Sequence, residues 1–366
     1  MLSWLAARFE LSRGDAQANV RPMEGLRGFA VLLVFCTHYV TLIGPWLSER
    51  AGLGRAAEAL HTVGNAGVDL FFVLSGYLIY GSLMAKPQAY VAFMRRRVRR
   101  IYPTFLVVFA VYVLLSLALP SERKIPEGGV AASIYLVENL LLLPGLFNIV
   151  PMITVAWSLS YEMFYYLALP IAIGALGLRH RSQPLRLLFW ASTSLALLFF
   201  CARLGGPVRL LLFVGGIGLW ELQQRRSLAA PGSSVGLSAL LLSLAAMLLP
   251  LSGQFGAGLR ALIGAVGFAV LCWACFERPQ GALARTFSWL PLRWLGNMSY
   301  SFYLLHGLAL KASFMVLAWL SPPSERGWGW FLLWLPPMLF VALLASAALY
   351  LLIELPLSLK PAVKPR

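Results

Sequence analysis

The first long apolar run of the chain carries two side chains suited to proton or acyl transfer. In GLRGFAVLLVFCTH, Arg27 and His38 stand 11 residues apart. Eleven steps of 100° bring a helix back to within about 20° of its starting direction, so both side chains lie on one face of the expected helix, separated by about 17 Å along its axis. The spacing places a permanent cation near one end of a membrane span and an imidazole, a possible base or nucleophile, near its middle.

A purely structural role for this pair stays open at this point. Arg27 could anchor the helix to lipid phosphates, and His38 could make a buried hydrogen bond. Ionisable groups inside a span nevertheless cost about 2.5–3.5 kcal/mol each, and proteins that keep them usually turn them toward a cavity.

Other apolar runs carry hydroxyl and ionisable groups at helical spacing. Glu162 is the most notable, because a carboxylate within about two turns of a span's outer end could bind a hydroxylated substrate or a proton. Small residues such as Ser75 serve helix packing more often than chemistry. The groups that share a face or a neighbourhood are Asp69 and Ser75 in GVDLFFVLSGYLIY, Ser158, Glu162 and Tyr166 in WSLSYEMFYYLALP, and Ser299, Tyr300 and His306 in SYSFYLLH.

The segment RRRVRRIYP, residues 95–103, holds five arginines in six positions. Such a cluster could bind anionic lipid, or it could hold a phosphorylated cofactor through bidentate contacts. The cluster alone does not choose between these two ligands.

The elements that position these residues are membrane helices. The chain has 366 residues, of which 60% are hydrophobic and 12% charged, and its mean hydropathy is +0.76. This composition excludes a soluble domain. The net charge of +16 is spread in short clusters between apolar runs, which argues against a nucleic-acid-binding surface.

We predict an all-α integral membrane protein, a bundle of about ten transmembrane helices. Every second connection between the expected spans, counted together with both terminal segments, holds most of the Lys and Arg residues. The positive-inside rule therefore predicts that both termini are cytoplasmic. A segment near 134–153 is interrupted by polar residues and prolines and is predicted to be re-entrant or interfacial. The expected spans are 26–46, 66–84, 102–119, 156–176, 187–203, 208–223, 234–251, 257–275, 296–319 and 329–353.

The expected organisation is a single membrane domain, residues 25–356, between two short cytoplasmic segments. Residues 1–24 predict an interfacial segment without a secretory signal pattern, and residues 357–366 predict a basic tail. The four cysteines all fall within expected spans, so no disulfide is expected. CWAC lacks the further ligands of a zinc site, and no metal is expected.

Six segments, in this order, resemble the acyltransferase-3 family of bacterial membrane O-acyltransferases, of the O-acetyltransferase type without the appended esterase-like domain. The resemblance covers residues 22–356. Its departure is Glu24, where the family commonly has Asp. The segments are MEGLRGFAVLLVFCTH, GVDLFFVLSGYLI, RRRVRRIYP, WSLSYEMFYYLALP, SYSFYLLH and LIELP.

The resemblance implies acyl transfer in the bacterial cytoplasmic (inner) membrane. The donor would be cytoplasmic acyl-CoA, usually acetyl-CoA, and the acceptor a hydroxyl of a glycan, lipopolysaccharide or lipid-linked saccharide at the outer side, among membrane lipids. By this resemblance Arg27, Arg97 and Arg100 would hold the phosphates of coenzyme A. His38 would act on the thioester as base or nucleophile, with Arg27 and Glu162 as its catalytic partners.

Weaker candidates for binding the acceptor are Asp69, Ser75, Ser158, Tyr300 and His306. The alternative function is a proton-coupled transporter of an anionic solute, with the acidic residues and histidines as proton relays. Against it, the sequence shows neither an internal repeat nor paired broken spans. A membrane scaffold would not explain the ionisable residues.

Overall fold

The computed structural model describes residues 2–10, 20–47, 52–225 and 228–359. Every regular element within these ranges is a helix, which confirms the all-α prediction. Parts of two predicted segments lie outside the described residues: 1 and 11–19 of the N-terminal segment, and 360–366 of the basic tail.

Ten helices occupy the predicted spans in order. They are α2 (Val20–Ile43), α4 (Ala66–Ala85), α5 (Tyr90–Ala118), α7 (Trp157–Ala175), α8 (Gln183–Leu204), α9 (Leu210–Gln223), α10 (Ser233–Met247), α11 (Gly253–Glu277), α14 (Ser299–Leu320) and α15 (Trp328–Leu349). The π-helix η6 (Tyr350–Leu359) continues α15. The shorter elements are α1 (Leu2–Phe9), α3 (Leu53–Gly64), α6 (Gly129–Leu140), α12 (Ala282–Phe287), α13 (Leu290–Asn297) and the 3-10 turns η1 (Gly44–Trp46), η3 (Pro120–Glu122), η4 (Thr154–Ala156) and η5 (Leu178–His180).

Seven segments of the described chain are long and apolar enough to cross a membrane, so the chain is a multi-pass membrane protein. The predicted count of ten is not reached by this criterion. Helices α9 and α10 have 14 and 15 residues, and α7 begins with the polar sequence WSLSYE. The seven segments are Arg21–Trp46, Gly54–Ala85, Tyr90–Ala118, Gln183–Leu204, Gly253–Glu277, Ser299–Leu320 and Trp328–Leu359.

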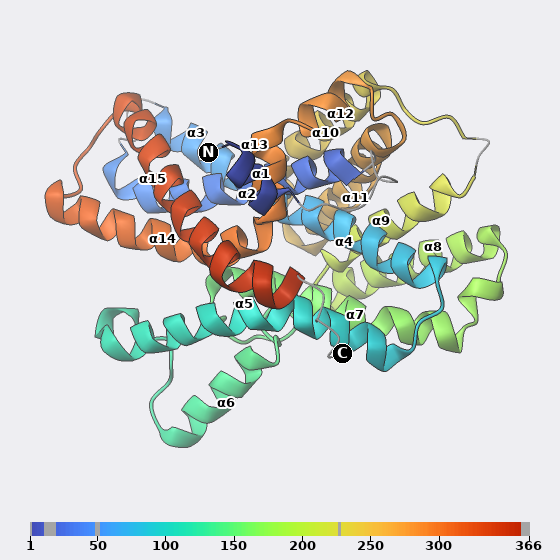
Figure 1. The fold of residues 1–366 in the computed structure, drawn as a ribbon, viewed down its shortest axis with the longest axis horizontal. Coiled ribbons are helices and arrows are strands. Elements are labelled where there is room, and N and C mark those ends of the chain that lie inside the picture. The colour runs from blue at the N-terminus through green and yellow to red at the C-terminus, as the bar shows by residue number, and fades with distance from the viewer. Residues whose placement is uncertain (1, 11–19, 48–51, 226–227, 360–366) are drawn as a thin grey trace.

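The interrupted segment near 134–153 begins as a helix and continues as irregular chain. Helix α6 projects from the body of the molecule beside α5 (Figure 1). After it, Leu142 has a φ of 57°, a conformation that is costly for a non-glycine residue. The buried Asn139 fixes the end of this irregular chain against α6, because its Oδ1 accepts a hydrogen bond from the Met152 amide at 2.7 Å.

Glycines bring α4 and α9 into backbone contact. A Cβ added to Gly76 would lie 2.1 Å from the Phe213 carbonyl oxygen, and one added to Gly216 would lie 2.0 Å from that of Val73. Membrane helices use small residues in this way to pack closely.

A similar contact fixes the start of α2 against α13. A Cβ on Gly28 would meet the Leu292 carbonyl oxygen at 2.0 Å, and one on Gly296 would meet that of Glu24 at 1.7 Å. Since Gly28 follows Arg27 directly, this close approach fixes the backbone from which the arginine extends.

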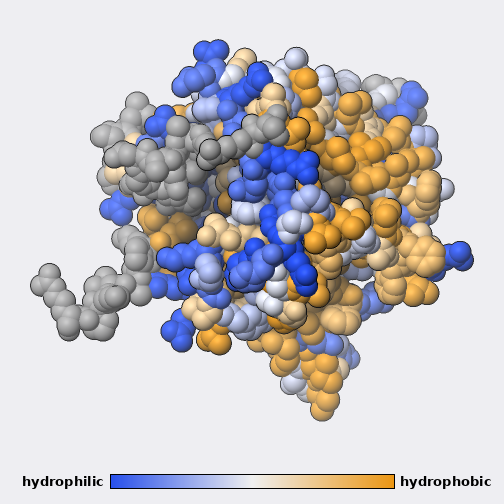
Figure 2. Space-filling model, turned by 90° about the vertical axis from the view of Figure 1, so that its right-hand side faces the viewer, coloured by the Kyte–Doolittle hydropathy of each residue, from blue (hydrophilic) through white to orange (hydrophobic). Residues whose placement is uncertain are grey.

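Figure 2 views the face onto which the α4–α5 and α7–α8 connections open. A band of hydrophilic side chains crosses this face, with apolar surface beside it. The basic cluster at 95–100 lies in the second and third turns of α5, near the α4–α5 connection. By the positive-inside rule, this is the face predicted to be cytoplasmic.

Candidate active site between two cavities

Helices α2 and α14 bring the predicted residues together in pairs. The Arg27 guanidinium donates to the Ser299 hydroxyl, with Nη2 at 3.0 Å and Nε at 3.3 Å. Farther along the same two helices, the rings of His38 and His306 have centroids 5.1 Å apart. These contacts confirm that Arg27 and His38 share one face of α2, and that Ser299 and His306 share one face of α14.

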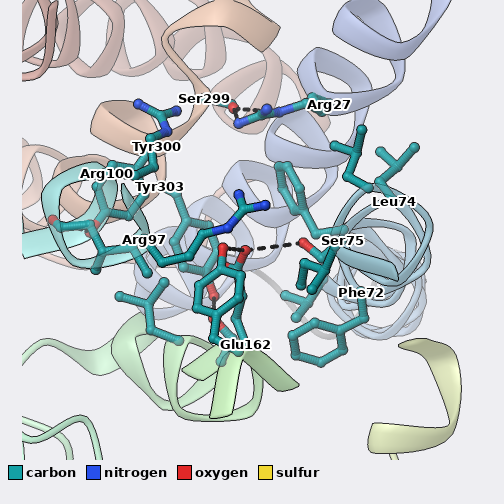
Figure 3. Close-up of a pocket in the computed structure, with 18 residues that line it drawn as sticks. Arg27, Phe72, Leu74, Ser75, Arg97, Arg100, Glu162, Ser299, Tyr300 and Tyr303 are labelled. Atoms are coloured by element: carbon teal, nitrogen blue, oxygen red, sulfur yellow. Dashed lines mark hydrogen bonds between the residues drawn. The ribbon is translucent and has the colours of Figure 1, made fainter. Parts of the chain in front are cut away.

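Arg27, Arg97 and Arg100 line one cavity, which we call the arginine cavity (Figure 3). Residues of α2, α4, α5, α7 and α14 form its walls. Its polar lining consists of Arg27, Ser75, Arg97, Arg100, Ser158, Glu162, Tyr166, Ser299, Tyr300 and Tyr303. Three cations face one lining carboxylate, so the cavity favours an anion.

Aromatic rings and a buried carboxylate hold two of these arginines. The Arg97 guanidinium lies over the rings of Phe93 and Tyr166, 5.0 Å from each centroid. Arg100 donates to Glu354 at 2.6 Å and lies 5.7 Å from the centre of the Tyr300 ring. Planar guanidinium groups stacked in this way are ordered before a ligand arrives.

Glu354 lies in the quoted motif LIELP, near the predicted cytoplasmic face, but the sequence assigned it no role in the site. It is completely buried. Besides Arg100, it accepts hydrogen bonds from the Ser301 amide at 3.0 Å and the Ser301 hydroxyl at 2.6 Å. The carboxylate therefore joins η6 to α5 and α14, and it positions Arg100 at the cavity.

Glu162 belongs to the arginine cavity and does not line the cavity that contains His38. Its Oε1 accepts hydrogen bonds from the Tyr166 hydroxyl at 2.5 Å and from the Ser75 hydroxyl at 3.4 Å. In Figure 3 the Arg97 guanidinium lies close to these groups. Glu162 is thus placed to orient the Tyr166 and Ser75 hydroxyls of the arginine cavity.

His38 lines a second cavity of about 640 Å³, which we call the histidine cavity. This volume is within the usual range of small-molecule sites. Its walls come from α2, α5, α14 and the chain around 152–155, and most of its lining is apolar. Its charged residues other than His38 are Glu122, Lys124 and Lys311, none of which the sequence had marked as a site residue.

Tyr303 separates the two cavities. It lines the arginine cavity, and its hydroxyl donates to the carbonyl oxygen of Val155, a residue of the histidine cavity, at 3.0 Å. The same hydroxyl lies 2.7 Å from Ser158 Oγ, on the arginine side. Tyr303 and Ser158 therefore form a thin polar wall through which the two cavities adjoin.

His306 is completely buried beside this wall and lines neither cavity. Its Nδ1 lies 2.8 Å from the Phe302 carbonyl oxygen and 2.9 Å from that of Tyr303. Because carbonyl oxygens only accept hydrogen bonds, we assign the ring proton of His306 to Nδ1. Its Nε2 has no hydrogen-bond partner among the described residues.

Asp69 lies outside both cavities. It is buried and forms an ion pair with Arg209 at 3.3 Å, and the Arg209 guanidinium lies 5.4 Å from the centre of the Trp157 ring. This arrangement joins α4 to the residue before α9 and does not bring Asp69 to a substrate site. In the part of the chain that the structure describes, no cluster of His, Cys, Asp or Glu has the arrangement of a metal site.

Comparison with known families agrees with this geometry. A family model for the acyltransferase domain of the acyltransferase-3 type matches residues 22–351. The chain belongs to the acyltransferase-3 family. This membership confirms the resemblance carried by the six segments and the expected enzyme class. No solved structure matches the chain.

Several known proteins are similar over part of their length. The acyltransferase MdmB of Streptomyces mycarofaciens is 31% identical over 49% of this chain and 44% of its own. The putative peptidoglycan O-acetyltransferase YrhL of Bacillus subtilis is 26% identical, over 78% of this chain and 47% of its own. The peptidoglycan O-acetyltransferase OatA of Listeria monocytogenes is also 26% identical, over 78% and 49%. The chain spans about half the length of the curated relatives it matches.

Proposed function

We propose that this chain transfers an acyl group, most simply acetyl, from acyl-CoA to a hydroxyl group of a glycan. The observation that carries the proposal is the division of one helix face between two adjoining cavities. Arg27 enters the cavity with the phosphate-binding chemistry, and His38 enters the other. A donor and an acceptor can thus approach His38 from opposite sides of the Tyr303 wall.

The donor would occupy the arginine cavity. Coenzyme A carries phosphates at one end and a thioester at the end of a long flexible arm. Guanidinium groups bind phosphate through charge-assisted, often bidentate hydrogen bonds, and Arg27, Arg97 and Arg100 would supply them. The arm would extend along the shared face of α2 and α14, so that the thioester reaches the wall beside His38.

In the first version of the reaction, His38 acts as a general base in the acyl transfer. The acceptor oxygen attacks the thioester carbonyl carbon, a new C–O bond forms and the C–S bond breaks. His38 takes the hydroxyl proton and returns it to the departing thiolate. In a second version the imidazole first carries the acyl group as a nucleophile and then yields it to the hydroxyl. Both versions produce an ester and free coenzyme A.

The charge distribution and the family support a placement in the cell. With ten crossings and both termini cytoplasmic, the arginine cavity would open to the cytoplasm, where acyl-CoA is made, and the histidine cavity to the outer side. The membrane would be the bacterial cytoplasmic membrane. Two of the similar proteins are named for peptidoglycan, which supports a glycan acceptor.

Mass spectrometry of cell-surface glycans tests the proposal. We expect cells that express the chain to gain an acyl mass, acetyl in the simplest case, that is missing from cells expressing the His38→Ala variant at the same membrane level. Solute counterflow into proteoliposomes without acyl-CoA, together with unchanged glycans, would instead favour a transporter.

A further inference from the structure

The histidine cavity opens sideways between α5 and α14. Among its lining residues, Leu119, which directly follows α5, is 37% exposed, and Met315 and Val316 of α14 are 52% and 57% exposed. Both helices are among the segments that can cross a membrane. Apolar side chains that line a cavity and are also exposed on a membrane-spanning helix face the lipid. An apolar chain could therefore enter the cavity directly from the bilayer.

The same cavity carries a small charged cluster formed by Lys124, Lys311 and Glu122. Lys311 Nζ contacts the Glu122 carboxylate. Among the described residues, the hydrogen-bond acceptors of Lys124 Nζ are neutral oxygens: the carbonyls of Pro151 at 3.2 Å and Met152 at 2.9 Å, and the Thr154 hydroxyl at 3.2 Å. Two ammonium groups and one carboxylate leave the cluster with a net positive charge.

The cluster is close to the reactive position. Lys311 lies four residues after Gly307, which also lines the cavity next to the His38–His306 pair. Four residues of helix correspond to about 6 Å. A ligand whose anionic group lies at Lys311 could therefore present a hydroxyl to His38 while its apolar chain lies between α5 and α14.

We infer that the acceptor is an amphiphile, a saccharide joined through phosphate to a lipid chain. Its phosphate would lie at Lys311 and Lys124, its chain at Leu119, Met315 and Val316, and a sugar hydroxyl at His38. This inference rests on the proposed function only in naming the hydroxyl as the group acylated. A free neutral glycan would gain nothing from the lysines or from the lipid-facing aliphatic side chains, whereas each buried methylene of a chain contributes about 0.8 kcal/mol.

Binding measurements on the purified full chain in detergent test the site without a known sugar. The probes are farnesyl phosphate, farnesol, inorganic phosphate and dioleoylphosphatidylglycerol, measured by native mass spectrometry. We expect farnesyl phosphate to bind at least about tenfold more tightly than farnesol or inorganic phosphate, because each of these lacks one of the two contacts. It should also bind more tightly than phosphatidylglycerol, whose phosphodiester carries a single negative charge.

Two charge variants of opposite sign separate electrostatics from simple damage to the site. Lys311→Gln should weaken farnesyl phosphate binding by about tenfold or more, whereas Glu122→Gln should strengthen it, because it removes the competing carboxylate. Arg123→Gln is the matched control: Arg123 lies in the same connection, pairs with the exposed Glu127 at 3.4 Å and does not line the cavity.

Equal binding of farnesyl phosphate and farnesol would overturn the inference, as would equal binding of inorganic phosphate or phosphatidylglycerol. An equal loss of farnesyl phosphate binding in Lys311→Gln and Glu122→Gln would also overturn the inference. Acetyl transfer from labelled acetyl-CoA is measured separately. Selective binding without any transfer would contradict the proposed function alone, and transfer without selective binding would contradict the inference alone.

Discussion

His38 of α2 and His306 of α14 lie with ring centroids 5.1 Å apart, beside the wall that separates the two cavities. The same helices pair Arg27 with Ser299 at 3.0 Å. The Arg27–Ser299 contact and the His38–His306 contact are therefore separated by eleven residues along α2 and by seven along α14, which correspond to about 17 Å and 11 Å of helix.

The first prediction concerns His306 as a residue that positions His38. Replacing His306 with Asn should lower kcat about 5- to 100-fold, because it removes the ring that packs against His38 and disturbs the buried hydrogen bonds to the Phe302 and Tyr303 carbonyls. The KM for acyl-CoA should stay unchanged, because His306 does not line the arginine cavity. Steady-state kinetics in nanodiscs would separate the two parameters. A change confined to KM would contradict a positioning role.

A second prediction concerns Glu354 and its ion pair with Arg100. Glu354→Gln should weaken acyl-CoA binding by about tenfold or more, because Arg100 loses its orienting charge. Glu221→Gln is the matched control, since Glu221 is also completely buried and pairs with Arg186 at 2.6 Å, away from either cavity. Both variants should lose thermal stability. Equal acyl-CoA affinity in the two would show that Glu354 acts only on folding.

The third prediction tests the close packing of α4 and α9. Gly216→Ala should lower Tm in detergent, because the new Cβ would lie 2.0 Å from the Val73 carbonyl oxygen. Gly218→Ala, in the same helix, meets no atom within 4 Å, so it should leave Tm unchanged or raise it through about 0.5–1 kcal/mol of helix propensity. Thermal unfolding of both variants by circular dichroism would check this contrast. Equal Tm values would contradict the packing described for α9.

A fourth prediction follows from the pKa of Lys124. Burial lowers this pKa below its ordinary 10.5, and the ammonium of Lys311 lowers it further, while Glu122 acts in the opposite direction. An anion binds the protonated lysine better, so affinity for farnesyl phosphate should be full below the lowered pKa and fall as pH rises through it. Native mass spectrometry across alkaline pH would follow the fall. In the Lys124→Gln variant, the loss of affinity for farnesyl phosphate should move toward higher pH. The same dependence of affinity on pH in the variant and the wild type would show that Lys124 does not bind the phosphate.

The sequence predicted the directions of side chains along a helix, because helical periodicity depends only on spacing. The shared faces of Arg27 with His38 and of Ser299 with His306 are both present. Periodicity does not tell which neighbouring helix a side chain meets. Glu162 was therefore expected near the acceptor or a histidine, and it lies with the arginines instead.

Residues far apart in sequence form the features that the sequence did not reveal. Lys311 meets Glu122 across 189 positions, and Glu354 meets Arg100 across 254. Lys311 lies inside the expected span 296–319 and Arg100 belongs to the predicted phosphate-binding cluster, but spacing along one segment does not show which carboxylate each would meet. Only the packing of α5, α14 and η6 brings them together.

Single-turnover transfer of a labelled acetyl group from acetyl-CoA to an acceptor glycan tests the central role of His38 most directly. It compares the wild-type chain with His38→Ala, both purified in nanodiscs. The two-cavity account predicts a loss of about 10²- to 10⁴-fold in rate, the usual contribution of a general base, with acetyl-CoA affinity retained because the arginine cavity is intact. A His38→Ala variant that transfers acetyl at the wild-type rate would contradict it.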